Sequence, residues 1–270
     1  MTNLPEELEK GLQFLNVGWN LEALRDVEFL PGGYSNHNWK VSYAGQAYVV
    51  RIPMQPQPYV DRAHEENWYQ RLPTSVGIKP IAFDSARGYM LSSWIEGVLL
   101  VDCWQDFTPD DLLNFVLELH RSLPSESRVY DVAKLLPLYS DEPLKATTPG
   151  DIRTTCHNDL SPWNVIVTRN GWITIDWEFV GSNDPLFDLV GIHAGLELEE
   201  VDLPSFVHRY LDLQGQTTNG LEQRLIECYR NFWAREYAWA HYQIQSGNDR
   251  AEILDQLDAA DAKLRKDSIA

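Results

Sequence analysis

Three oxygen-bearing side chains near the middle of the chain have the types and the spacing that a phosphate-transferring site requires. Residues 156–164 read Cys-His-Asn-Asp-Leu-Ser-Pro-Trp-Asn, and residues 175–178 read Ile-Asp-Trp-Glu. Phosphoryl transfer needs a carboxylate that orients and deprotonates the acceptor hydroxyl, together with oxygen ligands for a Mg²⁺ ion that bridges the nucleotide phosphates. We therefore predict that Asp159 is the base and that Asn164 and Asp176 are the metal ligands.

A plainer interpretation makes Asp159 and Asn164 ordinary turn residues and Asp176 the cap of a strand. The order of the three along the chain argues against it, and so does the predicted frame around them. Strands are expected at 163–168 and 172–175, joined by a turn at Asn170-Gly171, two residues that tolerate positive φ. Such a frame can bring a loop carboxylate, an amide and a hairpin-end carboxylate into one small volume.

Two regions of different secondary structure are expected to hold these residues. The first, residues 1–97, has strand-like runs at 37–43, 47–52, 79–83 and 88–94, with helical patterns at 4–15 and 59–72. The second, residues 98–270, is mainly helical, most clearly at 109–123 and 221–245. The predicted fold is of the α+β class, with a small antiparallel-sheet N-lobe and a helical C-lobe.

A glycine-rich turn in the N-lobe is a candidate phosphate-binding loop. Residues 31–36 read Pro-Gly-Gly-Tyr-Ser-Asn between two predicted strands. Glycine permits close approach of backbone N–H groups to phosphates, so Gly32, Gly33, Ser35 and Asn36 are predicted to contact the nucleotide. The Walker Gly-Lys-Ser/Thr pattern is absent, and an ordinary β-turn is the alternative.

Arg51 ends an apolar strand and is a second candidate for nucleotide binding, because its guanidinium can bind phosphate oxygens in pairs. Glu65, on the following helix, is the predicted ion-pair partner. Glu66 competes with it, since one position rotates a side chain by about 100° around a helix. Alternatively, all three are solvated surface charges.

The central motif resembles the aminoglycoside phosphotransferase and choline kinase superfamily, and within it the bacterial choline, ethanolamine and thiamine kinase-like branch. The matching residues are His157-Asn158-Asp159-Leu160-x-x-x-Asn164 and Asp176-Trp177-Glu178. Further matches in the same order are Arg51-Ile52-Pro53, Arg62-x-x-Glu65, Trp94-Ile95-Glu96-Gly97, Leu119-His120 and Asn183-Asp184-Pro185-x-x-Asp188-Leu189. The likeness runs from about residue 28 to residue 190, with weaker support to residue 245. One departure is Asn158, where many relatives have Gly.

This resemblance implies a protein-kinase-like fold and an enzyme that transfers phosphate from ATP to an alcohol group with the help of Mg²⁺. It places adenine against the strand at 90–94, with Ser93 and Trp94 as contacts. It also implies that Asp188 and His157 brace the catalytic loop, although Asp188 could equally be a plain helix N-terminal charge.

The aromatic stretch 228–242 is the candidate acceptor site. Tyr229 and Trp233 stand at i and i+4, and Trp239 and Tyr242 at i and i+3, so each pair shares a helix face. Aromatic faces attract quaternary ammonium groups, although a packed helical core gives the same pattern. With the resemblance, we predict a cationic alcohol: choline first, then ethanolamine. The predicted acceptor-binding residues are Trp233, Trp239, Tyr242, Glu178 and Asp184.

Other functions remain open at this stage. Thiamine also needs a cationic pocket, and aminoglycosides, sugars or homoserine are alternative acceptors. A pseudokinase-like binding protein is the non-enzyme alternative, but such proteins commonly lose one of the three central residues, and all three are intact here. A hydrolase using the same carboxylates would release phosphate without an acceptor.

The overall composition narrows the partners. The 270 residues include 40 acidic and 22 basic side chains, a net charge of −18. The sequence also has no cluster of Lys and Arg of the kind that binding to nucleic-acid phosphates requires. No apolar run reaches the length of a membrane span, and three scattered cysteines suit a reducing compartment. We expect a cytoplasmic protein that binds a nucleotide and a small alcohol, and no nucleic acid or membrane. The oligomeric state stays open.

Overall fold

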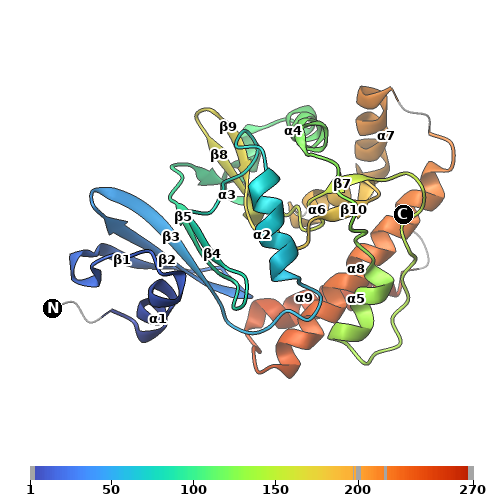
Figure 1. The fold of residues 1–270 in the computed structure, drawn as a ribbon. Coiled ribbons are helices and arrows are strands. Elements are labelled where there is room, and N and C mark those ends of the chain that lie inside the picture. The colour runs from blue at the N-terminus through green and yellow to red at the C-terminus, as the bar shows by residue number, and fades with distance from the viewer. Residues whose placement is uncertain (1–3, 197, 199–201, 216–217, 267–270) are drawn as a thin grey trace. The chain divides into compact units, whose positions relative to one another are not determined.

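The computed structural model describes residues 4–196, 198, 202–215 and 218–266, which form two compact units (Figure 1). Unit 1 contains residues 4–98 and Ile166–Glu178, and unit 2 contains Leu99–Val165 and the described residues from Phe179 onward. The hairpin segment 166–178 thus belongs to the strand-rich unit, although it lies between helices along the chain. The predicted α+β class is confirmed.

Unit 1 is built on an antiparallel sheet with the strand order β1-β2-β3-β5-β4. Its strands are β1 (Arg25–Leu30), β2 (Asn36–Tyr43), β3 (Gln46–Pro53), β4 (Ala82–Asp84) and β5 (Tyr89–Ser93). Ala44 and Gly45 join β2 to β3, both with positive φ, a turn geometry whose twist matches that of the flanking strands.

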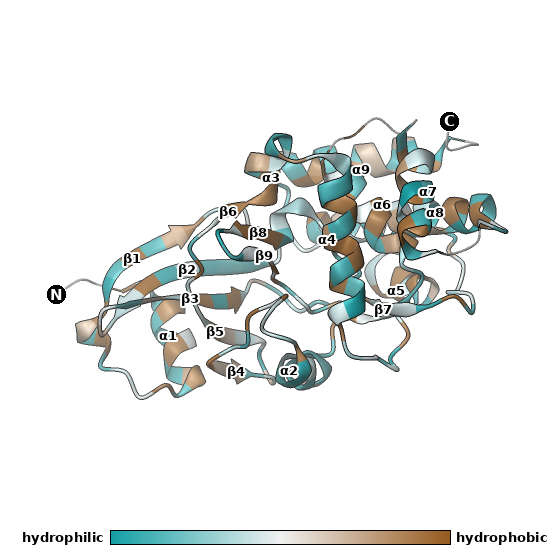
Figure 2. Ribbon diagram, turned by 90° about the horizontal axis from the view of Figure 1, so that it is seen from above, coloured by the Kyte–Doolittle hydropathy of each residue, from teal (hydrophilic) through white to brown (hydrophobic). Residues whose placement is uncertain are grey.

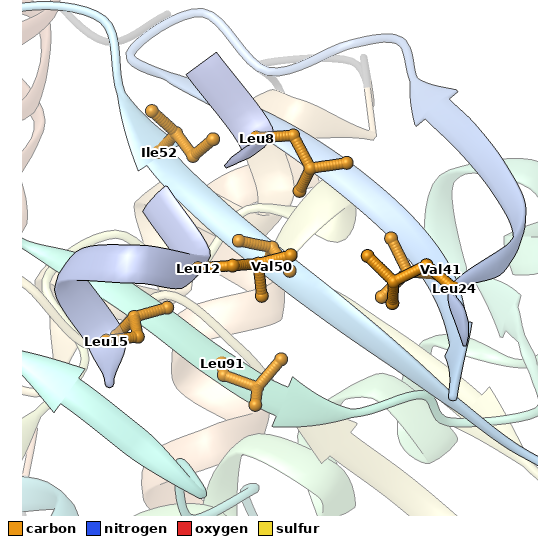
Figure 3. Packing of buried hydrophobic residues seen from close by; sticks show 8 residues of the cluster. All are labelled: Leu8, Leu12, Leu15, Leu24, Val41, Val50, Ile52 and Leu91. Carbon is orange, nitrogen blue, oxygen red and sulfur yellow. The ribbon is translucent and has the colours of Figure 1, made fainter. Parts of the chain in front are cut away.

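Helix α1 (Glu6–Leu15) covers one face of this sheet. Three leucines, one turn or so apart, project from α1 onto strand residues, as Figure 3 shows. The buried residues of this core are Leu8, Leu12, Leu15, Leu24, Val41, Val50, Ile52 and Leu91. The helical spacing of leucines predicted from the sequence therefore serves to close the sheet from one side.

Helix α2 (Arg62–Arg71) is largely polar (Figure 2) and begins at Asp61, whose carboxylate accepts hydrogen bonds from the next free N–H groups. It buries Trp68, which packs against Trp177 with 5.7 Å between ring centroids. Trp177 follows the hairpin of β8 (Val165–Thr168) and β9 (Gly171–Thr174). The predicted strand began at Trp163; Pro162–Asn164 instead form a 3₁₀ turn, η3, because proline cannot donate to a ladder.

Unit 2 is mainly helical. Its α-helices are α3 (Leu100–Cys103), α4 (Pro109–Ser122), α5 (Val132–Tyr139), α6 (Leu186–Gly195), α7 (Leu203–Gln214), α8 (Leu221–Gln245) and α9 (Ala251–Leu264). Helix α4 alternates apolar and polar colour in Figure 2 and buries Leu112, Leu113, Val116 and Leu117. Helix α8 packs against α5, α6 and α9. Strands β7 (Thr154–Cys156) and β10 (Gly181–Asn183) pair antiparallel. Over the described ranges, no helix has the length and apolar character of a membrane span.

Replacing Leu12 by Ala is expected to destabilise unit 1. Leu12 is 2% exposed, and the cavity left behind should cost about 3 kcal/mol of unfolding free energy. The matched control is Gln13→Ala, on the exposed side of the same turn, which should change it by less than about 0.5 kcal/mol. Denaturant titration measures both, and equal losses would contradict this account of the core.

Candidate active site

The carboxylate predicted to be the base lies in direct contact with a predicted metal ligand. The Asn164 side-chain Nδ2 donates to Asp159 Oδ2 at 2.9 Å and to the Asp159 carbonyl oxygen at 2.9 Å. These two bonds close the loop between the residues and fix the carboxylate. Because the amide donates through Nδ2, its oxygen is left as an acceptor, the kind of hard ligand that Mg²⁺ prefers.

Asp188, on α6, holds the backbone of this loop from below. Its carboxylate accepts from the backbone N–H groups of His157 and Asn158, both at 2.8 Å, and from His120 Nε2 at 2.9 Å. The side chain is buried, and burial alone would raise its pKa; the hydrogen bonds and the charge of His120 outweigh this and hold the pKa of Asp188 below its usual value. Asp188 therefore holds two consecutive peptide units of this loop in place, whereas the bracing role of the His157 side chain stays a prediction.

The backbone conformation and the side-chain contacts of Asn158 account for asparagine at a position where many relatives have glycine. Its backbone is left-handed, with φ of 63°, a conformation that Gly adopts without cost and Asn tolerates. Its Nδ2 lies within hydrogen-bond distance of the carbonyl oxygens of Cys156, Phe179 and Gly181, and its Oδ1 accepts from Asn183. The side chain thus binds the strand pair β7–β10 to the catalytic loop.

An arginine that the sequence analysis did not single out also contacts Asp159. Arg235, in the middle of α8, donates from Nη1 to Asp159 Oδ1 at 2.9 Å. Each oxygen of the Asp159 carboxylate therefore has a hydrogen-bond donor from a different element. No sequence signal distinguished it, because α8 carries other arginines, Arg224 and Arg230, and the distinguishing property of Arg235 is its burial.

In unit 1, Arg51 is buried between two carboxylates. Its Nη1 lies 2.8 Å from Glu65 Oε1 and 3.1 Å from Asp176 Oδ1. Glu65 is 0% exposed, whereas Glu66 is half-buried on another face of α2. The partner of Arg51 is thus Glu65, and Arg51 links the sheet, α2 and the hairpin end.

Arg62 extends this network. Its Nη1 lies 2.6 Å from Glu65 Oε2 and 2.7 Å from Glu178 Oε2. Burial raises the pKa of Glu178 to about 8, as does the charge of Asp176, while Arg62 opposes the rise. Three carboxylates thus share two guanidinium groups. Adding a cation at Asp176 would relieve the excess negative charge.

Asp176 itself has an uncommon backbone. Its φ is 62°, a left-handed conformation that few non-glycine residues adopt and that often marks functional positions. The conformation follows directly after the last residues of the β8–β9 hairpin. The strained conformation fits a residue whose carboxylate must point in one particular direction.

The glycine-rich loop has a shape that its residues dictate. Gly32 has φ of 101°, and a Cβ on Gly33 would lie 2.1 Å from the carbonyl oxygen of Asn36, so neither position accepts an ordinary side chain. The Ser35 carbonyl accepts from the Met54 N–H at 2.9 Å, which ties the loop to the end of β3. Gly33, Ser35 and Asn36 therefore lie at the mouth of the β2–β3 hairpin.

The residues predicted to contact adenine lie beside the first residues of β3, whereas the glycine-rich loop is tied to its last residues. Ser93 ends β5 opposite Tyr48, and Trp94 N–H donates to the Ala47 carbonyl at 2.9 Å. The Trp94 ring lies under Lys40, whose Nζ is 3.9 Å from the ring centroid. This backbone is held in register by β3.

The predicted acceptor residues are divided between the two units. Glu178 belongs to unit 1 and the other four to unit 2. Asp184 binds Arg224 with two hydrogen bonds, of 2.8 and 2.9 Å, and Trp233 is buried against Tyr229 with Lys263 Nζ 5.6 Å from its ring centroid. Tyr242 packs edge-on against Tyr139, and Trp239 is half-buried.

Residues 104–228, which include the loop of Asp159 and Asn164, match the phosphotransferase enzyme family. This segment of the chain is therefore similar to known phosphotransferases. The enzyme class and the family resemblance predicted from the sequence are thereby confirmed.

Relatives of this phosphotransferase extend the likeness beyond that segment. LicA of Haemophilus influenzae is 24% identical over 264 residues, spanning 85% of this chain and 77% of that protein. LicA of the H. influenzae strain ATCC 51907 is 47% identical over 113 residues, which are 39% of this chain and 41% of that protein. Thiamine kinase of Shigella boydii is 24% identical over 186 residues, or 62% of this chain and 65% of that protein.

Solved structures confirm the predicted protein-kinase-like fold. The crystal structure of choline kinase LicA from Streptococcus pneumoniae superimposes with a TM-score of 0.75 at 18% identity and covers 95% of this chain and 98% of that one. A choline/ethanolamine kinase family protein from Mesorhizobium loti gives 0.68 at 19% identity, with 96% and 95% covered. Together the matches support a small-molecule kinase.

Replacing Arg51 by Met in this phosphotransferase should cost about 3 kcal/mol of unfolding free energy, because it leaves buried Glu65 with one guanidinium fewer. The control Arg87→Met removes an exposed pair of the same unit and should cost less than about 1 kcal/mol. Chemical denaturation measures both variants. Adding Glu65→Gln to Arg51→Met should recover part of the loss; no recovery would show that charge burial is not the cause.

Proposed function

We propose that this phosphotransferase is a cytoplasmic, ATP- and Mg²⁺-dependent kinase that phosphorylates the hydroxyl of a small cationic alcohol, choline first and ethanolamine next. The observation that carries the proposal is the direct contact between Asp159 and Asn164, a carboxylate and an amide linked at 2.9 Å on a braced loop. A base and a cation ligand in contact are what transfer to an alcohol requires.

In this proposal, Asp159 orients the acceptor hydroxyl and takes its proton as the phosphate moves across. Asn164 and Asp176 would hold Mg²⁺, and the bound ion would supply positive charge to the nucleotide phosphates. The donor set fits that ion, because a side-chain amide and a carboxylate are hard oxygen ligands. Asp176 would need its direction fixed, and Arg51 at 3.1 Å supports this.

Nucleotide binding falls to unit 1. Gly32, Gly33, Ser35 and Asn36 would contact the phosphates through a loop without Cβ atoms at its two leading positions. Arg51 would bind a phosphate oxygen while Glu65 keeps its guanidinium in place. The backbone at Ser93 and Trp94 would contact adenine. A LicA structure has been solved in a complex with AMP, which supports a nucleotide site in this fold.

The choice of choline rests on two supports. The 47% identical segment belongs to LicA, a name shared with the S. pneumoniae choline kinase. Trp239 and Tyr242 offer aromatic surface on α8 for an ammonium group, whereas the ring of Trp233 already faces Lys263. Asp184 would act less as a ligand, since Arg224 neutralises it.

Thiamine is the second candidate acceptor. Thiamine kinases of Shigella and Escherichia coli match this chain at 24% identity over 186 residues. The thiazolium ring of thiamine is a cation too, so the same aromatic surface could receive it. Identity over the matched segment favours choline, and so does coverage, since the LicA match spans 85% of this chain and the thiamine kinase match spans 62%.

Replacing Asp159 by Asn is expected to lower kcat by about 10³-fold, because the amide cannot accept the hydroxyl proton. Asp110→Asn is the matched control: this exposed carboxylate also binds an arginine, Arg209, and should leave kcat unchanged. Steady-state ADP release measures both variants. An Asp159→Asn enzyme within tenfold of the parent would remove Asp159 from its assigned role.

An acceptor panel tests the substrate proposal. Purified enzyme with ATP and Mg²⁺ should release ADP fastest with choline, more slowly with ethanolamine, and chelation with EDTA should abolish the reaction until Mg²⁺ is restored. Glucose, homoserine and kanamycin are the comparison acceptors. Faster turnover of thiamine would shift the assignment to the second candidate, and turnover of none of the three cations would end the cationic-alcohol proposal.

A further inference from the structure

The guanidinium of Arg235 is paired with carboxylates of unit 2 through both of its terminal nitrogens. Its side chain is 7% exposed, and its Nη1 and Nη2 bind two different carboxylates, Asp159 at 2.9 Å and Glu236 at 2.5 Å. Only the first of these carboxylates is the proposed base. The arginine therefore joins the catalytic loop to a residue on its own helix.

Three phenyl rings line the same guanidinium. Its Cζ lies 5.4 Å from the ring centroid of Phe232, 5.8 Å from that of Phe187 and 6.0 Å from that of Phe179. Rings at these distances attract a cation and exclude water, so the direction of the guanidinium is fixed by packing as well as by charge. This aromatic box is occupied by a cation of the protein itself.

The line of contacts continues to the last helix. Gln256, on α9, donates from Nε2 to Glu236 Oε2 at 2.7 Å, and Glu236 binds Arg235 through its other oxygen. A half-buried glutamate near a second carboxylate would be less stable without both partners. Gln256, Glu236, Arg235 and Asp159 thus form one continuous series from α9 to the catalytic loop.

We propose that Arg235 is a positioning residue for the reaction, and that the series Gln256–Glu236–Arg235 sets the direction of the Asp159 carboxylate towards the acceptor. The inference rests on the proposed function, since it assumes that Asp159 is the base. Asn164 holds one carboxylate oxygen and Arg235 the other, so rotation of the carboxylate requires one of these bonds to break. Arg235 acts through Asp159 and does not contact the nucleotide in this scheme.

The first test separates positioning from folding. Arg235→Lys keeps the charge but offers no fixed pair of donors, and Arg235→Ala removes the guanidinium and leaves its space between the rings. Both should lower kcat about 100-fold with KM for ATP changed by less than about threefold, because misplacement of one reacting group costs chemistry and not nucleotide binding. The control is Arg209→Gln, which removes the exposed ion pair between Arg209 on α7 and Asp110 on α4, and its kcat should match that of the parent.

The second test is chemical rescue. Adding methylguanidine to Arg235→Ala should raise its kcat by about tenfold or more, with no such effect on the parent or on Arg209→Gln. Gln256→Leu, at the far end of the series, should give a smaller loss of kcat at unchanged KM for ATP. Thermal unfolding of each variant provides the folding readout.

The outcomes separate the two proposals. Loss of activity in Asp159→Asn together with unchanged kcat in Arg235→Lys and Arg235→Ala would overturn the role of Arg235 alone. Loss of kcat that follows unfolding temperature, without rescue, would reduce Arg235 to a structural residue. Full activity in Asp159→Asn would overturn the proposed function whatever Arg235 does. If no acceptor of the panel is turned over, ADP release with water as the acceptor is the readout for the same variants.

Discussion

The buried carboxylate of Asp188 is the constraint on which the loop of residues 157–164 depends. A charge with no solvent exposure is stable only when donors surround it, and here the donors are two consecutive backbone N–H groups and a histidine. Satisfying Asp188 therefore fixes the peptide planes at His157 and Asn158. The left-handed turn at Asn158 follows, and with it the direction in which Asp159 leaves the loop.

The same rule governs the other acidic groups of the candidate site. Each of four carboxylates has an oxygen within 3.1 Å of an arginine nitrogen: Asp159, Asp176, Glu178 and Asp184. Glu178 shares its arginine nitrogen with Glu65. Arginines thus offset part of the negative charge where function is proposed. Arginine suits this task because its fork holds two oxygens in set directions, whereas lysine would hold one.

Local patterns in the sequence were sufficient for the elements and for the central motif. The aromatic stretch predicted at 221–245 is helix α8 with the same limits, whereas the strand predicted from Trp163 begins only at Val165. Spacing does not reveal partners far apart in the chain, so the pairs of Asp159 with Arg235 and of Asp184 with Arg224 were missed. The contact of Lys263 with the ring of Trp233 was also missed, because it depends on how α8 and α9 pack.

The interrupted layout of unit 1 has a consequence for synthesis on the ribosome. Arg51 pairs with Asp176, which lies 125 positions later in the sequence. This contact of unit 1 can therefore form only after the β8–β9 hairpin has been synthesised. At translation rates of about 5–20 residues per second, this delay is on the order of 6 to 25 seconds. During that interval, the guanidinium of Arg51 can contact Glu65 but not Asp176, and a newly made chain would complete unit 1 only after all of α4 and α5 had been translated.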